Sequence, residues 1–265
     1  MSAPGPLPAV VEAPAKLTLS LRVTGVRGDG YHELDAEMVS LDLADVIELD
    51  AGSGLTIVDE TPGGLGLGDL GADDDNLVAR AARALGLGFA ARLRKRIPAG
   101  AGLGGGSSDA AAVLRWAGCR DLTLAARLGA DVPFCVAGGR ARVRGIGEQV
   151  TPLPVEDRRF ALLLAPFGVD TASVYRAWDD GHRTVDAASV NDLEGAALAV
   201  EPRLGRWRAA LARMTGRPAM LAGSGATWFV ELSPDDPPVA TTPVEVDGQY
   251  GVLIEARTRP AEAED

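Results

Sequence analysis

The chain contains the stretch Ile97-Pro-Ala-Gly-Ala-Gly-Leu-Gly-Gly-Gly-Ser-Ser-Asp-Ala-Ala-Ala112, in which five glycines precede two serines and an aspartate. Glycine lets the backbone adopt left-handed angles and approach a ligand closely, because it has no Cβ. Ser and Asp are favoured N-cap residues, and Ala110–Trp116 is rich in helix formers. A glycine loop that leads into a helix directs unpaired N–H groups and the positive end of the helix dipole toward one place. The stretch therefore predicts an anion site, with phosphate as the expected anion.

Phosphate-binding loops of other kinds do not fit this stretch. A Walker loop ends in Gly-Lys-Ser or Gly-Lys-Thr, but no lysine lies between Lys95 and the expected helix, and the protein-kinase motifs are absent. Gly100, Gly102 and Gly105 match the spacing G-x-G-x-x-G, yet a dinucleotide fold also needs a buried apolar strand before the loop. The residues before this loop are charged instead, at Arg92, Arg94, Lys95 and Arg96. A simple turn needs one or two glycines rather than five, so a nucleotide phosphate site is the stronger interpretation.

The composition is typical of a globular protein that acts on a small molecule. Apolar residues make up 46% of the 265 residues, which predicts a sizeable core for one large domain or two of ordinary size. The formal net charge of -11 argues against a nucleic acid or an anionic membrane surface as the main partner. No apolar run is long enough to span a membrane, and residues 1–8 lack the pattern of a signal peptide. We therefore expect a cytoplasmic protein whose Cys119 and Cys135 are buried thiols.

Hydrophobic periodicity predicts the elements around the loop. In residues 16–23 leucine and valine alternate with polar residues, so Lys16, Thr18 and Ser20 should share one face of a half-buried strand. Further strands are expected at Val39–Leu43, Val46–Asp50, Leu55–Val58, Phe89–Ile97, Phe160–Ala165 and Gly251–Ala256. The basic strand that ends at Ile97 should lie at a sheet edge. Helices are expected at Asn76–Leu85, Asp121–Leu128, Val174–Trp178 and Leu198–Met214.

Several short segments along the chain contain polar residues or glycines of the kind found in active sites. In chain order they are Pro14-Ala15-Lys16, Gly30-Tyr31-His32-Glu33-Leu34, Asp75-Asn76-Leu77, the glycine loop, Gly129-Ala130-Asp131-Val132-Pro133-Phe134, Thr171-Ala172-Ser173-Val174-Tyr175, Asn191-Asp192-Leu193-Glu194 and Gly223-Ser224-Gly225. Together they resemble the GHMP kinase superfamily, whose members phosphorylate small metabolites with ATP. The segment at 30–34 is similar to that of the branch that phosphorylates CDP-methylerythritol in non-mevalonate isoprenoid synthesis. Other GHMP kinases do not generally share it.

The resemblance extends over nearly the whole chain, from Pro14 to Ala256, and implies an α+β, two-domain GHMP kinase fold. An N-terminal, ribosomal-protein-S5-domain-2-like α/β domain would span residues 1–156. A C-terminal, ferredoxin-like α+β domain would span residues 157–265. ATP and the acceptor would bind in the cleft between them, and the implied reaction is phosphorylation of the 2-hydroxyl of CDP-methylerythritol.

The resemblance also implies site residues, position by position. Lys16 and Asp131 would be catalytic, although the spacing alone is equally typical of a helix cap at Asp131. ATP and Mg²⁺ would be held by Asn76, Pro98, Gly100, Gly102, Leu103, Gly104, Gly105, Gly106, Ser107 and Ser108, with Ser108 as the candidate metal ligand. The acceptor would contact Thr18, Tyr31, His32, Thr171, Tyr175, Gly223 and Ser224.

One position departs from the family pattern. The residue two after the motif lysine is usually Asn in the family, whereas this chain has Thr18, which keeps a hydroxyl but loses the reach of the amide. A homoserine or mevalonate type of GHMP kinase therefore stays an alternative, as does a nucleotide-binding relative without catalytic activity. Without the family pattern, Tyr31 reads as a packed aromatic residue and His32 as a surface histidine. For the assembly we expect a monomer or a weak homodimer.

Overall fold

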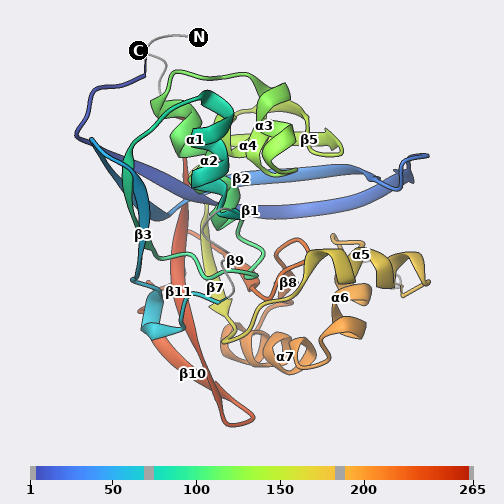
Figure 1. Cartoon of the computed structure of the whole chain (residues 1–265). Helices are drawn as coiled ribbons and strands as arrows, with labels where there is room; N and C mark the ends of the chain where they lie inside the picture. The colour runs from blue at the N-terminus through green and yellow to red at the C-terminus, as the bar shows by residue number, and fades with distance from the viewer. Residues whose placement is uncertain (1–3, 69–74, 183–188, 263–265) are drawn as a thin grey trace.

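The computed structural model describes residues 4–68, 75–182 and 189–262, and its strands form two sheets that meet at one strand (Figure 1). The N-terminal sheet contains β1 (Ala9–Val26), β2 (His32–Asp50), β3 (Gly54–Asp59), β4 (Ala90–Lys95), β5 (Arg140–Gly145) and β6 (Gln149–Leu153). The C-terminal sheet contains β7 (Arg159–Leu164), β8 (Met220–Leu221), β9 (Trp228–Leu232), β10 (Thr242–Val246) and β11 (Gln249–Arg259). Strand β11 pairs with β7 through Val252–Arg257 and then with β2 through its last two residues, so it joins the two sheets.

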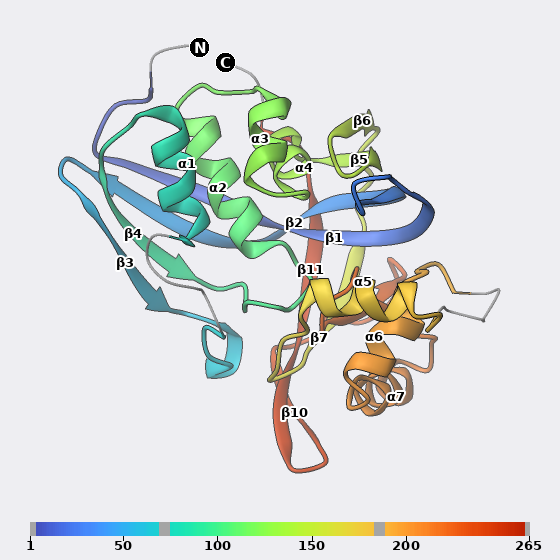
Figure 2. The ribbon, with the colours of Figure 1, turned by 45° about the vertical axis from the view of Figure 1, so that its right-hand side comes forward.

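The helices divide between the two sheets. Helices α1 (Leu77–Leu85), α2 (Gly105–Trp116), α3 (Leu122–Leu128) and α4 (Val132–Ala137) lie together on one side of the N-terminal sheet. Helices α5 (Thr171–Asp179), α6 (Glu194–Val200) and α7 (Leu204–Thr215) gather beside the C-terminal sheet, as Figure 2 shows. A 3-10 turn covers Pro62–Gly64. Within the described ranges no helix is long and apolar enough to cross a membrane.

The predicted break between residues 43 and 46 is wrong, because β2 continues through it. Asp45 lies inside the strand and is fully buried. Its carboxylate accepts hydrogen bonds from the backbone N–H groups of Arg96 and Ile97 and from the Lys95 ammonium. A buried carboxylate is tolerated when its oxygens are satisfied in this way. Asp45 is therefore the point where β2 holds the start of the glycine loop.

The predicted edge position of the basic strand is also wrong. Strand β4 lies between β3, to which it is parallel, and β2, to which it is antiparallel. Its charges are accommodated because Ala91, Leu93 and Lys95 face the interior, whereas Arg92 and Arg94 face outward. Arg94 donates to the Glu60 carboxylate at 2.7 Å on that outer face. A strand in a sheet with one solvated face can carry charge at every second residue.

The helix predicted at Leu198–Met214 is in fact two helices. Helix α6 ends at Val200 and α7 begins at Leu204, with Pro202 between them. Proline lacks the N–H that would continue the α6 hydrogen-bond ladder, which explains the break. The expected domain boundary after residue 156 falls between β6 and β7, which belong to different sheets. It stays a prediction, since β11 crosses back to β2.

Candidate active site

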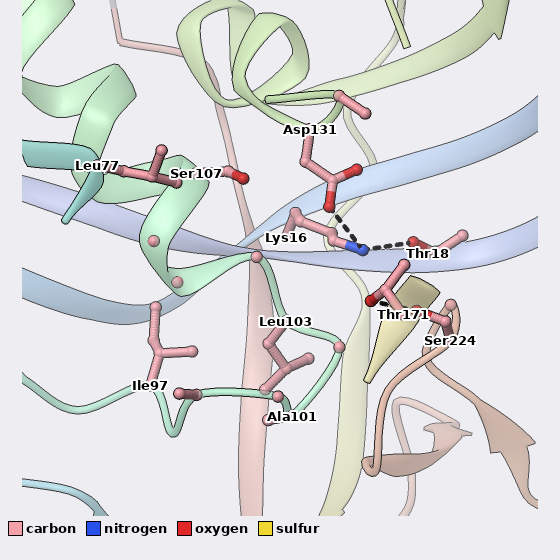
Figure 3. Close-up of a pocket in the computed structure, with 18 of the residues that line it drawn as sticks. Lys16, Thr18, Leu77, Ile97, Ala101, Leu103, Ser107, Asp131, Thr171 and Ser224 are labelled. Carbon is pink, nitrogen blue, oxygen red and sulfur yellow. Dashed lines mark hydrogen bonds and ion pairs between the residues drawn. The ribbon is translucent and has the colours of Figure 1, made fainter. Parts of the chain in front are cut away.

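A cavity of about 420 Å³ lies where the glycine loop faces the two halves of the fold, a volume in the usual range for small-molecule sites. Its walls come from Lys16 and Thr18 of β1, from the loop between Ile97 and Ser107, and from Asp131 before α4. The C-terminal half contributes Thr171 of α5 and Ser224, which Figure 3 shows. It also contributes Tyr175 of α5 and Gly223. The structure thus brings together residues that are separated by about two hundred positions in the sequence.

The glycines of the loop are required by both backbone angles and close contacts. Gly100, Gly102 and Gly104 have φ angles of 68°, 79° and 67°, in the left-handed region that favours glycine. A Cβ on Gly102 would lie 2.3 Å from the carbonyl oxygen of Ala222. A Cβ on Gly104 would lie 2.6 Å from Cγ of Lys16. The loop can therefore touch both the Gly223–Ser224 turn region and Lys16 only because these side chains are absent.

Helix α2 begins at Gly105, earlier than the Ser107 start that the sequence suggested. Its N-cap is Gly104, which has no side chain to cap the first turn. The N–H groups at this end thus have no side-chain acceptor from the cap residue, and the helix dipole adds positive potential there. An anion in the cavity would meet this end of α2 directly.

The two loop serines face different ways. Ser107 lines the cavity. Ser108 is fully buried, and its hydroxyl donates to the carbonyl oxygen of Pro14 at 2.6 Å. Ser108 therefore ties α2 to β1, and its geometry does not support the metal-ligand role expected for it. Of the two hydroxyls, only that of Ser107 is available to the cavity.

Two β-bulges direct Lys16 and Thr18 into the site. The pairing of β1 with β2 shifts register between Pro14 and Lys16 and again between Thr18 and Ser20. A bulge switches the face to which the following residues point. Outside the bulges, Ala13 and Leu21 belong to one hydrophobic cluster, whereas Leu17 between the bulges belongs to the other. The simple alternation predicted for this strand is interrupted, and Ser20 does not share the face of Lys16 and Thr18.

Lys16 is held by two oxygen atoms of different character. Its ammonium lies 3.3 Å from a carboxylate oxygen of Asp131 and donates to the Thr18 hydroxyl at 3.1 Å (Figure 3). Asp131 occupies the N-cap position of α4, yet its side chain makes no capping hydrogen bond. The helix-cap interpretation of Asp131 is therefore wrong, and the carboxylate is directed to the lysine. Lys16 is almost fully buried, which strengthens this ion pair relative to one in water.

Beside the cavity, the rings of His32 and Tyr175 come together. Their ring centroids lie 4.7 Å apart, and the His32 ring also meets the edge of Trp178 at 5.5 Å. The Nε2 atom of His32 lies 2.7 Å from a carboxylate oxygen of Asp179. Burial raises the pKa of Tyr175, so its phenol stays neutral. Tyr31 is 60% exposed, and of these three aromatic residues only Tyr175 lines the cavity, whereas Tyr31 and His32 do not.

The remaining candidate residues line the cavity. Pro98 and Leu103 lie in its wall, and Asn76 caps α1 by accepting a hydrogen bond from Val78 N at 2.9 Å. At the opposite end, the hydroxyls of Thr171 and Ser224 lie 2.9 Å apart, one from α5 and one from the Gly223–Ser224 turn.

The sequence interpretation missed a buried ion cluster behind the glycine loop. The Lys95 ammonium donates to Asp109 at 2.9 Å and to Asp45, and all three side chains are almost fully buried. Burial raises the pKa of Asp109 to about 7, against the lowering effect of Lys95 and with the charge of Asp45 adding to the rise. The alternation in β4, which places Lys95 with Ala91 and Leu93, is a signal that could have found it.

Known kinases resemble this chain in sequence. Residues 76–139 match the family model described as GHMP kinases N terminal domain. The 4-diphosphocytidyl-2-C-methyl-D-erythritol kinase of Paracoccus denitrificans is 40% identical over 235 residues, which cover 82% of this chain and 84% of that relative. The enzyme of the same name from Cereibacter sphaeroides (strain ATCC 17029 / ATH 2.4.9) is 40% identical over 245 residues, covering 82% and 87%.

Solved structures confirm the fold prediction. A crystal structure of 4-(cytidine 5'-diphospho)-2C-methyl-D-erythritol kinase has 35% sequence identity and a TM-score of 0.66, and the match covers 85% of this chain and 90% of that one. The mevalonate kinase of Methanococcus jannaschii, at 13% identity with a TM-score of 0.56 and coverage of 95% and 98%, shares the fold alone. The alignments at about 40% identity extend over most of both chains. The chain therefore belongs to the 4-diphosphocytidyl-2-C-methyl-D-erythritol kinase family of the GHMP kinases.

Proposed function

We propose that this chain transfers the terminal phosphoryl group of ATP to the 2-hydroxyl of 4-diphosphocytidyl-2-C-methyl-D-erythritol. The observation that carries the proposal is the convergence of Lys16 and Asp131, 3.3 Å apart, beside a glycine loop that leads into an uncapped helix. Relatives that are about 40% identical over most of their length are named for this activity. Phosphoryl transfer asks a protein mainly for positioning and charge stabilisation, and these residues supply both.

The triphosphate would lie against the loop from Gly100 to Gly106. The first turn of α2 offers backbone N–H donors, and Lys16 adds a full positive charge within the same cavity. The left-handed glycines let the main chain approach the phosphates closely.

Mg²⁺ would neutralise part of the charge of the triphosphate and polarise the phosphoryl group. The described residues contain no group of three or more His, Cys, Asp or Glu side chains that could hold a metal ion. We therefore propose that the metal binds together with ATP. Ser107, rather than Ser108, is the loop hydroxyl within reach of it, because only Ser107 lines the cavity.

The roles of the two catalytic residues follow from their charges. Asp131 would orient the acceptor hydroxyl and accept its proton as the oxygen bonds to phosphorus. Lys16 would offset the charge on the transferred phosphoryl group. A loose transition state demands little base strength, so positioning by Asp131 matters more than proton affinity.

The acceptor would bind between the aromatic group and the catalytic pair. His32 and Tyr175 offer ring faces against which a cytosine could stack. Tyr31, although outside the cavity wall, presents an exposed ring on the neighbouring loop and stays a proposed contact. Thr18, Thr171, Gly223 and Ser224 line the end nearest Lys16, where the methylerythritol would lie.

The cellular setting is proposed on related grounds. For the assembly, our proposal is a monomer or a weak homodimer. A net charge of -11 disfavours nucleic acid as a partner. ATP as the phosphoryl donor supports a cytoplasmic location.

The test is direct detection of the phosphorylated product by mass spectrometry. The purified chain would be incubated with ATP and Mg²⁺ and with 4-diphosphocytidyl-2-C-methyl-D-erythritol, homoserine or mevalonate in parallel. We expect product from the first acceptor alone. Product from homoserine or mevalonate would assign the chain to another GHMP activity, and ATP binding without product from any acceptor would favour a non-catalytic relative.

A further inference from the structure

The Asn191-Asp192-Leu193-Glu194 segment has no part in the mechanism above. Its first residue, Asn191, is nonetheless 2% exposed, and its side chain makes several hydrogen bonds. Its side-chain N–H₂ group donates to the carbonyl oxygens of Leu221 at 3.0 Å and Gly223 at 2.6 Å. Its side-chain oxygen accepts from the N–H of Leu193 at 2.9 Å. Both donor hydrogens and the acceptor are thus used, and only a carboxamide offers this combination in so short a side chain.

The backbone around Asn191 is attached to β1. The N–H of Leu21 donates to the carbonyl of Val190 at 2.8 Å, and the N–H of Asp192 donates to the carbonyl of Leu21 at 2.9 Å. The Asp192 carboxylate also accepts from the N–H of Val23 at 2.9 Å. Leu21 lies three residues beyond Thr18 on the same strand. The Asn191 amide therefore connects the strand that carries Lys16 with the turn after β8.

That turn touches both halves of the candidate site. A Cβ on Gly223 would lie 3.4 Å from the Lys16 ammonium nitrogen and 3.6 Å from the Thr18 hydroxyl. The Ser224 hydroxyl meets Thr171, as Figure 3 shows. Farther along, a Cβ on Gly225 would lie 2.1 Å from the backbone nitrogen of Gly102 in the glycine loop.

Backbone hydrogen bonds also run from the end of the turn to the glycine loop. The N–H of Ala226 donates to the carbonyl of Gly100 at 3.3 Å, and that of Thr227 donates to the carbonyl of Ala101 at 3.1 Å. If the Gly223 carbonyl moved, the turn would therefore shift both Lys16 and the glycine loop, which it contacts on opposite sides.

We propose that Asn191 is a positioning residue for phosphoryl transfer. It does not touch the substrates but holds the carbonyls of Leu221 and Gly223, and through them the turn that sets Lys16 against the glycine loop. The inference rests on the proposed function, because it assigns Asn191 a part in that same reaction. Two buried carbonyls accept from this one amide, and a side chain without two N–H donors cannot make both bonds.

The test compares Asn191→Asp with Ser189→Ala. The Asp variant keeps the shape of the side chain but turns an oxygen, instead of a donor, toward the two carbonyls. Ser189 bonds only the backbone of Asn191, with its hydroxyl donating to the carbonyl and accepting from the N–H, so Ser189→Ala perturbs the same loop without changing the amide. Both variants would be measured for kcat, for KM of each substrate and for thermal unfolding.

We expect Asn191→Asp to lower kcat by about tenfold to a hundredfold, the range for a small misplacement of reacting groups, and to change kcat by a larger factor than the KM for ATP. Ser189→Ala should keep kcat close to the wild-type value. Wild-type kcat in a folded Asn191→Asp variant would overturn the proposal. If that variant does not fold, Asn191→Ser, which retains one donor, takes its place with the same criterion.

Amide hydrogen exchange provides a measurement that does not depend on which molecule accepts the phosphoryl group. In Asn191→Asp the amides of Gly225 and Ala226, which bond to the carbonyls of Ala222 and Gly100, should exchange faster than in the wild type, whereas those of α3 should not. Unchanged exchange at both amides would overturn the positioning role. If the wild type fails to phosphorylate 4-diphosphocytidyl-2-C-methyl-D-erythritol, the proposed function fails, and the exchange result still decides the role of Asn191.

Discussion

The Lys16 ammonium lies 3.3 Å from the Asp131 carboxylate although the two residues come from a strand and a helix start that are 115 positions apart in the sequence. The Lys16 side chain is 6% exposed and that of Asp131 33%. The lysine is thus withdrawn from water while the carboxylate still faces the cavity. The buried Lys16 can thus provide a fixed positive charge, and the more exposed Asp131 can contact the hydroxyl of an incoming substrate.

Removing either charge should abolish most of the activity. We expect Lys16→Met and Asp131→Asn each to lower kcat by roughly a hundredfold or more, the range for the loss of an electrostatic or acid–base group. Steady-state kinetics at saturating ATP would measure the change. Arg92→Met is the matched control, since Arg92 is an exposed cation on the outer face of β4. An Asp131→Asn enzyme with nearly full kcat would disprove the assignment.

Thr18 should act through Lys16. Its hydroxyl accepts a hydrogen bond from the ammonium at 3.1 Å in a buried setting. Thr18→Val keeps the shape but removes the acceptor, and we expect kcat to fall by about tenfold, in line with the worth of a hydrogen bond to a charged group. Thr18→Ser keeps the hydroxyl and should retain most of the activity. Equal kcat values for the Val and Ser variants, measured under the same conditions, would exclude this role.

Local patterns predicted a large part of the fold. The glycine loop, the helix that follows it, the helix up to Leu85 and most strands were recognisable because they depend on residues close together in the sequence. The resemblance to the GHMP kinases added the order of the segments and the choice of Lys16 and Asp131. The edge position of β4, the break in β2 and the single helix before Met214 were wrong, because each depends on which strand pairs with which or on one proline.

The finer parts of the site depend on distant pairing and were therefore not predictable. The bulges that direct Lys16 and Thr18 inward are set by the register of β1 on β2. The inward turn of Ser108 depends on the Pro14 carbonyl, ninety-four positions away. The part that Asn191 plays depends on a turn that follows thirty residues later. No local periodicity carries such information.

We expect Gly104 to be essential because a Cβ at this position would clash with Lys16, in addition to straining the backbone. Gly104 and Gly86 have almost the same φ, 67° and 66°, but a Cβ on Gly86 would meet nothing within 4 Å. Both Gly→Ala variants should lose about 1–2 kcal/mol of stability from left-handed strain. Only Gly104→Ala should also lose kcat and raise the KM for ATP, because its methyl group would displace Lys16. Equal kinetics of the two variants, with unfolding measured in denaturant, would contradict this.

His32 should serve the acceptor and not ATP. Its ring packs on Tyr175, and its Nε2 atom lies 2.7 Å from a carboxylate oxygen of Asp179. We expect His32→Ala to raise the KM for the acceptor by about tenfold, the worth of one aromatic contact and one hydrogen bond, and to leave the KM for ATP unchanged. His182, the other histidine of the chain, is exposed and is the matched control. An unchanged acceptor KM in His32→Ala would remove His32 from the binding site.

The buried cluster of Lys95, Asp45 and Asp109 should make stability depend on pH. The pKa of Asp109 is raised to about 7 in the folded state, from 3.8 in the unfolded chain. Between these values the folded state binds more protons, so the free energy of unfolding should fall as the pH rises from about 4 to about 7. Asp109→Asn does not titrate there and should flatten this fall, whereas the exposed Asp157→Asn should not. Urea unfolding at several pH values would measure both.

Lys95→Met tests the same cluster from the opposite side. Removal of the ammonium leaves the carboxylates of Asp45 and Asp109 buried without their cation, and this should cost about 3–5 kcal/mol of stability. The loss should be smaller at pH 5 than at pH 8, because below the raised pKa of about 7 the Asp109 carboxyl of the wild type already carries a proton, and less buried negative charge then depends on the ammonium. A loss that is the same at both pH values would mean that Asp109 is ionised throughout, held so by Lys95 despite its burial.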